Sequence, residues 1–392
     1  MAEVAILGAA RTPIGGFQGA LAGTAAPRLG GAAISAALAR AGAPADRIDE
    51  VLMGCVLTAG LGQAPARQAG FHGGLDEGVP ATTLNKMCGS GMVALMLAHD
   101  RIALGAADAI VAGGMENMSS APYLLPRMRS GARIGHAQAI DHMFLDGLED
   151  AYQSGRLMGS FAEECAADFG FTREAQDAYA LASLTRALAA QAQDSFAAEI
   201  VPVPAPTRSG EMLVTADEQP GTARPEKIPT LKPAFRPGGT VTAANSSSIS
   251  DGAAALVLAA VPTALAWRLP IRARLIGHAT HAQAPADFPT APVPAARKLL
   301  SRIGWQIDDV DLWEVNEAFA VVPMAFMTEL GVPHDRMNVN GGACSLGHPI
   351  GASGARIVVT LLHALEARGL KRGVAAICIG GGEGAAIAIE CP

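Results

Sequence analysis

The 392-residue sequence has few cysteines and few charges. Its six cysteines are scattered singly, with no CxxC pair and no histidine at metal-ligand spacing, so we expect neither a disulfide framework nor a bound metal. The chain has 29 basic and 36 acidic residues and no block of lysine or arginine. Nucleic acid and anionic membrane surfaces are therefore not expected as partners.

Export signals and membrane-spanning runs are also lacking. The opening "MAEVAILGAARTP" places an acidic residue before a short apolar run and Arg11 after it, the reverse of a signal peptide. The most apolar stretch, "AAALVLAAVPTALAW", is interrupted by Pro262. The final "IAIECP" carries no peroxisomal or retention signal. We expect a globular protein of the cytoplasm.

The chain does contain internal similarity. "DRIDEVLMGCV" (46–56) resembles "DDVDLWEVNEA" (308–318), "CGSGMVALMLA" (88–98) resembles "GASGARIVVTLL" (351–362), and "AIVAGG" (109–114) resembles "AICIGG" (376–381). The second copies follow the first by 262, 263 and 267 residues, in the same order. Three ordered matches indicate two similar halves.

Apolar runs that alternate with helical patterns predict an α/β fold with parallel βαβ units. We predict an N-terminal half at 1–118 that is completed by 250–270, and a C-terminal half at 271–392. The region between them, 119–249, differs in composition and contains proline-rich stretches such as "VPVPAPTRSG". It is predicted to be an inserted loop domain that binds substrate.

Cys88 lies in "NKMCGSG", directly before an apolar helical pattern. A small buried cysteine at a tight turn is one interpretation. A nucleophile is the other, because the positive end of a helix stabilises a thiolate.

The second half supplies groups that would complement a nucleophilic cysteine. His348 lies between glycines before the repeated helix, Cys378 ends an apolar strand, and "NEAFA" follows another strand with Asn316 and Glu317. Each has a structural alternative: a turn histidine, a core cysteine and a helix cap. Two cysteines, a histidine and an amide nevertheless fill complementary roles in acyl chemistry, and open α/β sheets bind ligands at the carboxyl ends of their strands.

The whole chain resembles the thiolase family, of the acetyl-CoA acetyltransferase or 3-ketoacyl-CoA thiolase type. The similar motifs are, in order, "ARTPIGGFQGAL", "NKMCGSG", "GGMENMS", "GTVTAANSSSISDGAA", "NEAFA", "GHPIGASGA" and "CIGGGEG". The resemblance implies the five-layered αβαβα thiolase fold. It also implies a role in fatty acid metabolism and a homo-oligomer, of which a tetramer is favoured over a dimer, with the segment 57–70 at a subunit interface.

The resemblance assigns catalytic roles by position. Cys88 would be acylated by an acyl-CoA, His348 would be its base, and Cys378 would move the proton at the α carbon of the second acyl-CoA. One oxyanion hole would consist of His348 and a water held by Asn316, and the other of the N–H groups of Cys88 and Gly380. Glu317 and Glu383 would hold loops rather than react.

No cofactor is expected to be bound permanently, since coenzyme A and acyl-CoA are the substrates. Ser247 matches the family's contact with the pantetheine arm, and Ala318 and Phe319 match positions that line its tunnel. Arg224 and Lys227 are candidates for contacts with the CoA phosphates.

Two positions depart from the family pattern. Leu157 replaces a histidine of many acetoacetyl-CoA thiolases, and Phe288 is larger than the usual residue of the acyl pocket, so the subtype and the acyl chain length stay open. Three other functions fit these residues less well than a thiolase does. A ketoacyl-ACP synthase would lack Cys378, a non-catalytic lipid carrier would have lost one of the four groups, and a cysteine hydrolase would not explain a second cysteine.

Overall fold

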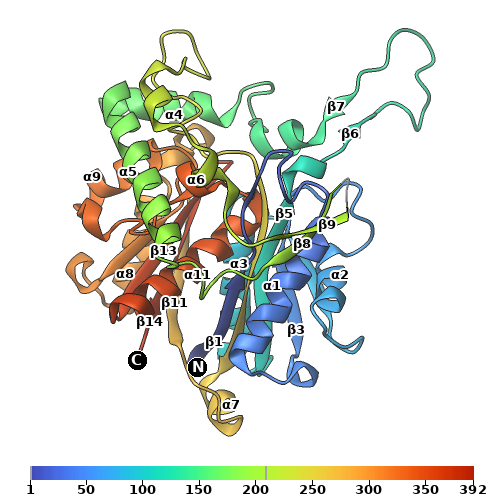
Figure 1. Cartoon of the computed structure of the whole chain (residues 1–392), viewed down its shortest axis with the longest axis vertical. Helices are drawn as coiled ribbons and strands as arrows, with labels where there is room; N and C mark the ends of the chain where they lie inside the picture. Colours follow the sequence, from blue (N-terminus) through green and yellow to red (C-terminus); the bar gives the residue numbers. More distant parts are fainter. Residues whose placement is uncertain (1, 208–209) are drawn as a thin grey trace.

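The computed structural model describes residues 2–207 and 210–392. Its centre is a mixed sheet in which two arms meet (Figure 1). The first arm contains, in spatial order, β4 (Ala81–Leu84), β3 (Glu50–Gly54), β5 (Ala109–Asn117), β10 (Ser250–Ala260) and β1 (Val4–Arg11), with the short β2 (Gly15–Gly16) beside β10. The second arm contains β11 (Ala273–Ala282), β14 (Glu383–Glu390), β13 (Arg372–Ile379) and β12 (Leu312–Val315). An antiparallel pairing of β1 with β11 joins the two arms.

Helices lie between the arms and outside both of them. The inner layer is formed by α3 (Ser90–Ala103) and α11 (Ile350–Arg368), the outer layers by α1 (Ala26–Ala41) and α2 (Pro65–His72) on one side and α8 (Pro292–Ile303) and α9 (Val321–Leu330) on the other. Alternate residues of a strand face opposite sides of the sheet, so each arm needs helices on both faces. In β1, Val4 and Ile6 pack in the inner core, whereas Ala5 and Leu7 pack in an outer one. The predicted αβαβα layering is confirmed.

The internal repeat is confirmed by a duplicated hydrogen-bond pattern. One carboxylate oxygen of Asp49 accepts from the N–H groups of Asp108 and Ala109, and one of Asp311 accepts from those of Lys371 and Arg372. These equivalent hydrogen bonds align β5 with β13 at an offset of 263 residues in the sequence. The predicted match of "AIVAGG" with "AICIGG" at 267 residues was therefore wrong by four positions, because both strands are rich in small apolar residues and similar letters recur along them.

The two inner helices cross where they begin. A Cβ atom on Gly354 would lie 2.5 Å from the backbone nitrogen of Met92, and one on Gly91 would lie 2.9 Å from that of Ala355. Only glycine permits this approach. The crossing brings the loops before α3 and α11, which carry Cys88 and His348, to the same place in the molecule.

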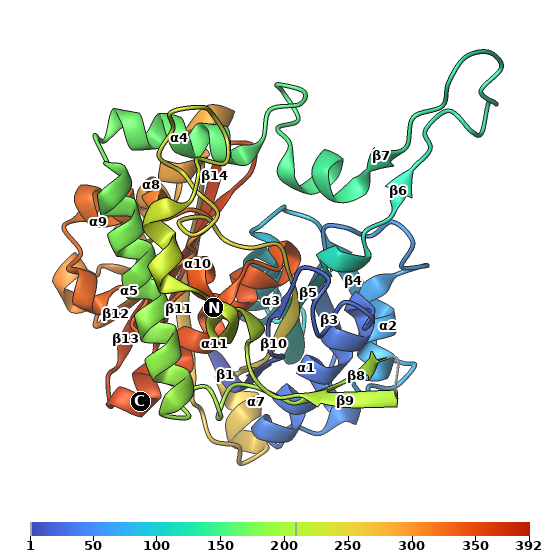
Figure 2. The same ribbon diagram turned by 45° about the horizontal axis from the view of Figure 1, so that its top comes forward.

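The region between the halves contributes smaller elements around this crossing. It contains the hairpin β6 (Tyr123–Leu124) and β7 (Ile140–Asp141), a π-helical turn over Phe144–Leu148, α4 (Met158–Asp168), α5 (Arg173–Ala192), the hairpin β8 (Val203–Thr207) and β9 (Gly210–Val214), and α6 (Glu218–Thr222). The loop between β6 and β7 projects far from the body (Figure 2). Two short helices, α7 (Val261–Ala266) and α10 (Ala343–Leu346), complete the chain.

Helix α11 is long and apolar enough to cross a membrane, but 89% of its apolar window is buried inside the fold. The burial follows from the position of α11 between the two arms of the sheet.

Candidate active site

A cavity of about 380 Å³ lies at the crossing of α3 and α11. Seven of the ten predicted site residues line it: Cys88, Ser247, Ala318, Phe319, His348, Cys378 and Gly380. They come from both halves and from the loop before β10. The pseudo-symmetric chain thus brings together groups that are up to 292 residues apart in sequence.

The loop that carries Cys88 is held by Ser90, the first residue of α3. The Ser90 hydroxyl donates to the carbonyl of Met87 at 2.6 Å and accepts from the N–H of Lys86 at 2.8 Å. Met87 has a φ of 48°, a left-handed conformation that is uncommon for a side chain of this size. The tight turn presents the thiol of Cys88 to the cavity.

The Cys88 thiol is in its protonated form at neutral pH. Burial raises its pKa to about 11, although hydrogen bonds from the backbone N–H groups of Gly380 and Cys88 act in the opposite direction. The helix terminus was expected to favour the thiolate. Desolvation outweighs it, because Cys88 lies two residues before the first helical residue in an apolar cavity.

His348 lines the same cavity, and Ser353 fixes the orientation of its ring. Ser353 donates its hydroxyl proton to the carbonyl of Pro349 at 2.9 Å, so its oxygen accepts from Nδ1–H of His348 at 2.6 Å. This assignment leaves the Nε2 lone pair free. Burial, with Arg356 nearby, lowers the pKa of His348 to about 3, which makes the resting ring neutral.

Three buried polar atoms of predicted site residues lack a partner in the described part of the chain, one on His348, which lines the cavity, and two on Asn316, which is not among its lining residues. Nε2 of His348 and both side-chain amide atoms of Asn316 have no hydrogen bond to any residue within 2–207 and 210–392. Asn316 follows β12 and is held by its backbone N–H, which donates to the carbonyl of Ala376. Buried polar groups are nearly always hydrogen-bonded, so these atoms mark a position where a polar guest is favoured.

Cys378 lies near the end of β13 and is 1% exposed. Burial raises its pKa well above the usual range, and the neighbouring Cys88 raises it further. Cys378 is therefore a neutral thiol and a proton donor at rest.

Two glutamates, Glu317 and Glu383, hold loops, as the sequence analysis expected of both. Glu317 accepts hydrogen bonds from the side chains of Tyr179, Ser183 and Asn338 and from the N–H of Cys344. Glu383, also predicted to hold a loop, pairs with Lys86 at 2.5 Å and so ties the Cys88 loop to β14.

Glu116 was missed by the sequence analysis. It is fully buried and accepts from the N–H groups of Val56, Leu57 and Gly351, which joins the loop after β3 to the beginning of α11. Burial raises its pKa to about 7. A carboxylate within the apolar strand "AIVAGGMEN" was the available signal.

A channel for an extended molecule leads to the thiols. Ser247 donates its N–H to the carbonyl of Ala318 at 2.9 Å, and this contact forms one wall. A second cavity of about 340 Å³ contains Arg224 and Lys227 and shares Ala243 and Ser248 with the first. The two exposed cations therefore lie toward the outside of the channel and not beside the thiols.

The inner end of the first cavity is apolar. Phe288 is 3% exposed there, and its ring packs edge to face on Phe161 and Phe319 at 6.2 and 6.4 Å. Leu148, Met158 and Phe235 complete this wall. The sequence indicated Phe288 but not the other three, because they belong to the irregular region between the halves.

Comparison with known proteins agrees with this arrangement. Models of the thiolase N-terminal and C-terminal domains match residues 4–261 and 269–391. The chain is 50% identical over 392 residues to the acetyl-CoA acetyltransferase of Pseudomonas aeruginosa, with 99% of both chains covered. It is 48% identical to the probable acetyl-CoA acetyltransferase of Escherichia coli K12, with 100% of this chain and 99% of that one covered.

Two solved structures have a similar fold. The acetyl-CoA acetyltransferase of Bacillus anthracis superposes with a TM-score of 0.97 at 40% identity, covering 100% of this chain and 99% of that one. The Acat5 thiolase of Ascaris suum, solved in complex with coenzyme A, superposes with a TM-score of 0.94 at 42% identity, with both chains fully covered.

Proposed function

This chain belongs to the thiolase family, and we propose that it transfers acetyl groups between acetyl-CoA molecules through an S-acetyl intermediate on Cys88. The observation that carries the proposal is the single cavity that contains two thiols, Cys88 and Cys378, together with the Nε2 atom of His348. A cysteine hydrolase needs one thiol and one base. A second thiol has a role when the reaction also removes or adds a proton at the α carbon of an acyl-CoA.

In the first half-reaction the thioester of acetyl-CoA is exchanged for one on the enzyme. The Cys88 proton moves to Nε2 of His348 while the sulfur attacks the carbonyl carbon. The tetrahedral intermediate collapses, the bond to the CoA sulfur breaks, and the CoA thiolate takes the proton from His348. Acetyl-Cys88 and free CoA are the products.

In the second half-reaction a carbon–carbon bond forms. Cys378 first loses its thiol proton to solvent, and the thiolate then removes a proton from the carbon α to the carbonyl of a second acetyl-CoA. The resulting enolate attacks the acetyl carbon on Cys88. The Cys88–acyl bond breaks to give acetoacetyl-CoA. The departing Cys88 thiolate recovers a proton from solvent or from the Cys378 thiol. Thiolysis runs the same steps backwards, with Cys378 as the acid.

Both half-reactions place negative charge on a carbonyl oxygen, which preorganised donors stabilise. We assign one group of donors to the N–H groups of Cys88 and Gly380, which already point toward the Cys88 sulfur. The other consists of His348, once protonated, and a water bound by Asn316. The unpartnered amide of Asn316 supports this assignment.

The channel fits an extended CoA molecule. We assign Ser247, Ala318 and Phe319 to the pantetheine arm and Arg224 and Lys227 to the phosphates, in keeping with the order of these residues from the thiols to the surface. The complex of Ascaris suum Acat5 with coenzyme A supports CoA as the ligand.

We further propose a homo-oligomer, with a tetramer favoured over a dimer. The predicted interface segment 57–70 includes the exposed Gly62 and Gln63. The projecting loop between β6 and β7 also exposes large apolar side chains, among them Leu125, Met128 and Ile134. A monomer in light scattering at working concentration would contradict this part.

The proposal is tested by incubating the enzyme with acetyl-CoA and following CoA and acetoacetyl-CoA. It predicts a rapid release of one CoA per active chain, followed by acetoacetyl-CoA and CoA in equal amounts. A steady release of CoA with acetate and without acetoacetyl-CoA would instead identify a hydrolase.

A further inference from the structure

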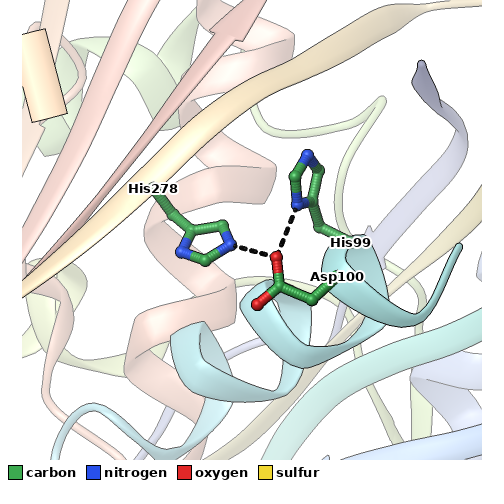
Figure 3. Close-up of side chains that lie close together, drawn as sticks. All are labelled: His99, Asp100 and His278. Atoms are coloured by element: carbon green, nitrogen blue, oxygen red, sulfur yellow. Dashed lines mark hydrogen bonds and ion pairs between the residues drawn. The ribbon is translucent and has the colours of Figure 1, made fainter. Parts of the chain in front are cut away.

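A second group of reactive side chains lies away from the cavity of the thiols. His99 and Asp100, from α3, and His278, from β11, turn toward one another (Figure 3). One carboxylate oxygen of Asp100 lies 3.1 Å from Nδ1 of His99 and 2.8 Å from Nε2 of His278. The two imidazole rings pack edge to face with centroids 5.1 Å apart. The acyl-transfer mechanism uses none of the three.

We propose that His99, Asp100 and His278 bind a divalent transition-metal ion, of which Zn²⁺ fits best, and that this ion links the two halves of the fold. The three ligand atoms lie within 4.8 Å of one another. Zn²⁺ bonds to imidazole nitrogen and carboxylate oxygen at about 2.0–2.2 Å, so its tetrahedral ligands are about 3.4 Å apart. The two observed N···O distances, 3.1 and 2.8 Å, would open by a few tenths of an ångström, and the two ring nitrogens, which lie within 4.8 Å of each other, would adjust toward the same spacing.

The chemistry of the three ligands selects the metal class. Two imidazoles and one carboxylate suit Zn²⁺, and also Ni²⁺ or Cu²⁺, rather than Ca²⁺ or Mg²⁺, which take oxygen ligands. Because the Asp100 side chain is 50% exposed, water can reach the fourth position. Asp100 accepts from both rings when each carries its proton on the facing nitrogen. On metal binding each neutral ring would move that proton to its other nitrogen, so that the freed lone pair bonds to the ion and both hydrogen bonds are replaced by metal bonds.

An ion at this site would stabilise the fold, because its ligands come from both halves of the chain. Helix α3 belongs to the first half and β11 to the second, and the side chains of His99 and His278 are 81–83% buried where the two meet. An ion held from both sides binds the folded state and not the unfolded chain, so it raises stability by an amount that grows with the logarithm of its concentration above the dissociation constant. This site is not evident in the sequence, because His278 is 178 residues from Asp100.

The proposal is tested by Co²⁺ and Zn²⁺ binding to the full-length enzyme. We expect one Co²⁺ per chain, with the visible absorption of a tetrahedral site and without the near-ultraviolet charge-transfer band of a thiolate ligand. His278→Asn and His99→Asn should each weaken binding by at least about ten- to hundred-fold. Zn²⁺ should raise the unfolding temperature of the wild type relative to EDTA and leave that of both variants unchanged.

Two controls separate this site from others. His136→Asn changes an exposed histidine of the projecting loop and should leave metal binding intact. Cys88→Ala should also retain the nitrogen and oxygen spectrum, which excludes binding at the thiols. Should a histidine variant not fold in EDTA, Asp100→Asn serves in its place, since its side chain is half exposed. Binding that Cys88→Ala abolishes, binding that the histidine variants retain, or no stoichiometric binding would each overturn the proposal.

Discussion

Nδ1 of His348 lies 2.6 Å from the hydroxyl oxygen of Ser353, whose own proton is given to the carbonyl of Pro349. The hydroxyl can therefore only accept from the ring, and Nε2 is left to act as the base. Ser353 and the residue that holds the Cys88 loop, Ser90, are separated by 263 residues, and both lie in the first turn of equivalent helices. The repeat thus supplies one serine to position the nucleophile and one to position its base.

Ser353→Ala should lower kcat while it leaves KM nearly unchanged. A hydrogen bond of this kind contributes about 1 kcal/mol, which corresponds to about five-fold in rate. Nitrogen chemical shifts of His348 should show a mixture of tautomers in the variant and a single one in the wild type. Thr360→Val, which removes another buried hydroxyl of α11, is the control and should change neither readout. An unaltered tautomer in Ser353→Ala would contradict the role given to Ser353.

The reactivity of Cys88 should rise steadily with pH. Its pKa of about 11 lies above the ordinary value, so the thiolate fraction is small at neutral pH and grows about ten-fold per unit until the pH approaches 11. The measurement is the rate of iodoacetamide modification of residue 88 in enzyme without substrate, between pH 6 and the highest pH at which the fold persists. A plateau below pH 8 would indicate a preformed thiolate–imidazolium pair instead.

Glu116→Gln should destabilise the protein by about 1–3 kcal/mol. Both oxygens of Glu116 accept backbone N–H bonds, and the amide nitrogen of glutamine would leave at least one buried N–H without an acceptor. Urea unfolding gives the free energy. Glu383→Gln makes the same chemical change in a partly exposed pair with Lys86 and should cost less than about 1 kcal/mol. Equal losses in both variants would contradict the structural role of Glu116.

Phe288→Leu should shift preference toward longer acyl chains. The Phe288 ring lies against the inner end of the cavity, and a smaller side chain leaves room for additional carbons. Each methylene newly buried is worth about 0.8 kcal/mol, or about four-fold in kcat/KM. Thiolysis of 3-ketoacyl-CoA substrates of increasing length is the measurement. Phe161→Leu, which alters the ring behind Phe288 and outside the cavity, should weaken stability without a change in preference.

The layers of the fold could be predicted because the two halves of the sequence repeat. The candidate site residues could be predicted because cysteine and histidine are rare in this chain. The small residues of "AIVAGG" and "AICIGG" are too alike to fix how β5 aligns with β13. Asp49 and Asp311 do fix it, through hydrogen bonds that form only once the chain is folded. The protonation of Cys88 could not be predicted either, since burial in the cavity depends on residues of the inserted region. His99, Asp100 and His278 meet only because α3 packs beside β11.

The proposed mechanism gives Cys88 and Cys378 separate roles, acylation for Cys88 and proton transfer for Cys378. Acylation of Cys88 involves no proton at carbon, whereas condensation and thiolysis both require Cys378 to move one. A positioned acid or base contributes about 10²–10⁴-fold to the step that uses it. Cys391→Ser, at a buried cysteine outside the cavity, provides the matched control.

The most direct measurement is rapid-quench acylation of Cys378→Ser with acetyl-CoA, followed by peptide mass mapping and compared with steady-state turnover. The account predicts that the acetyl group appears on Cys88 at close to the wild-type rate while condensation and thiolysis fall by about 10²–10⁴-fold. Loss of acylation as complete as the loss of turnover, or an acetyl group found on another residue, would contradict it.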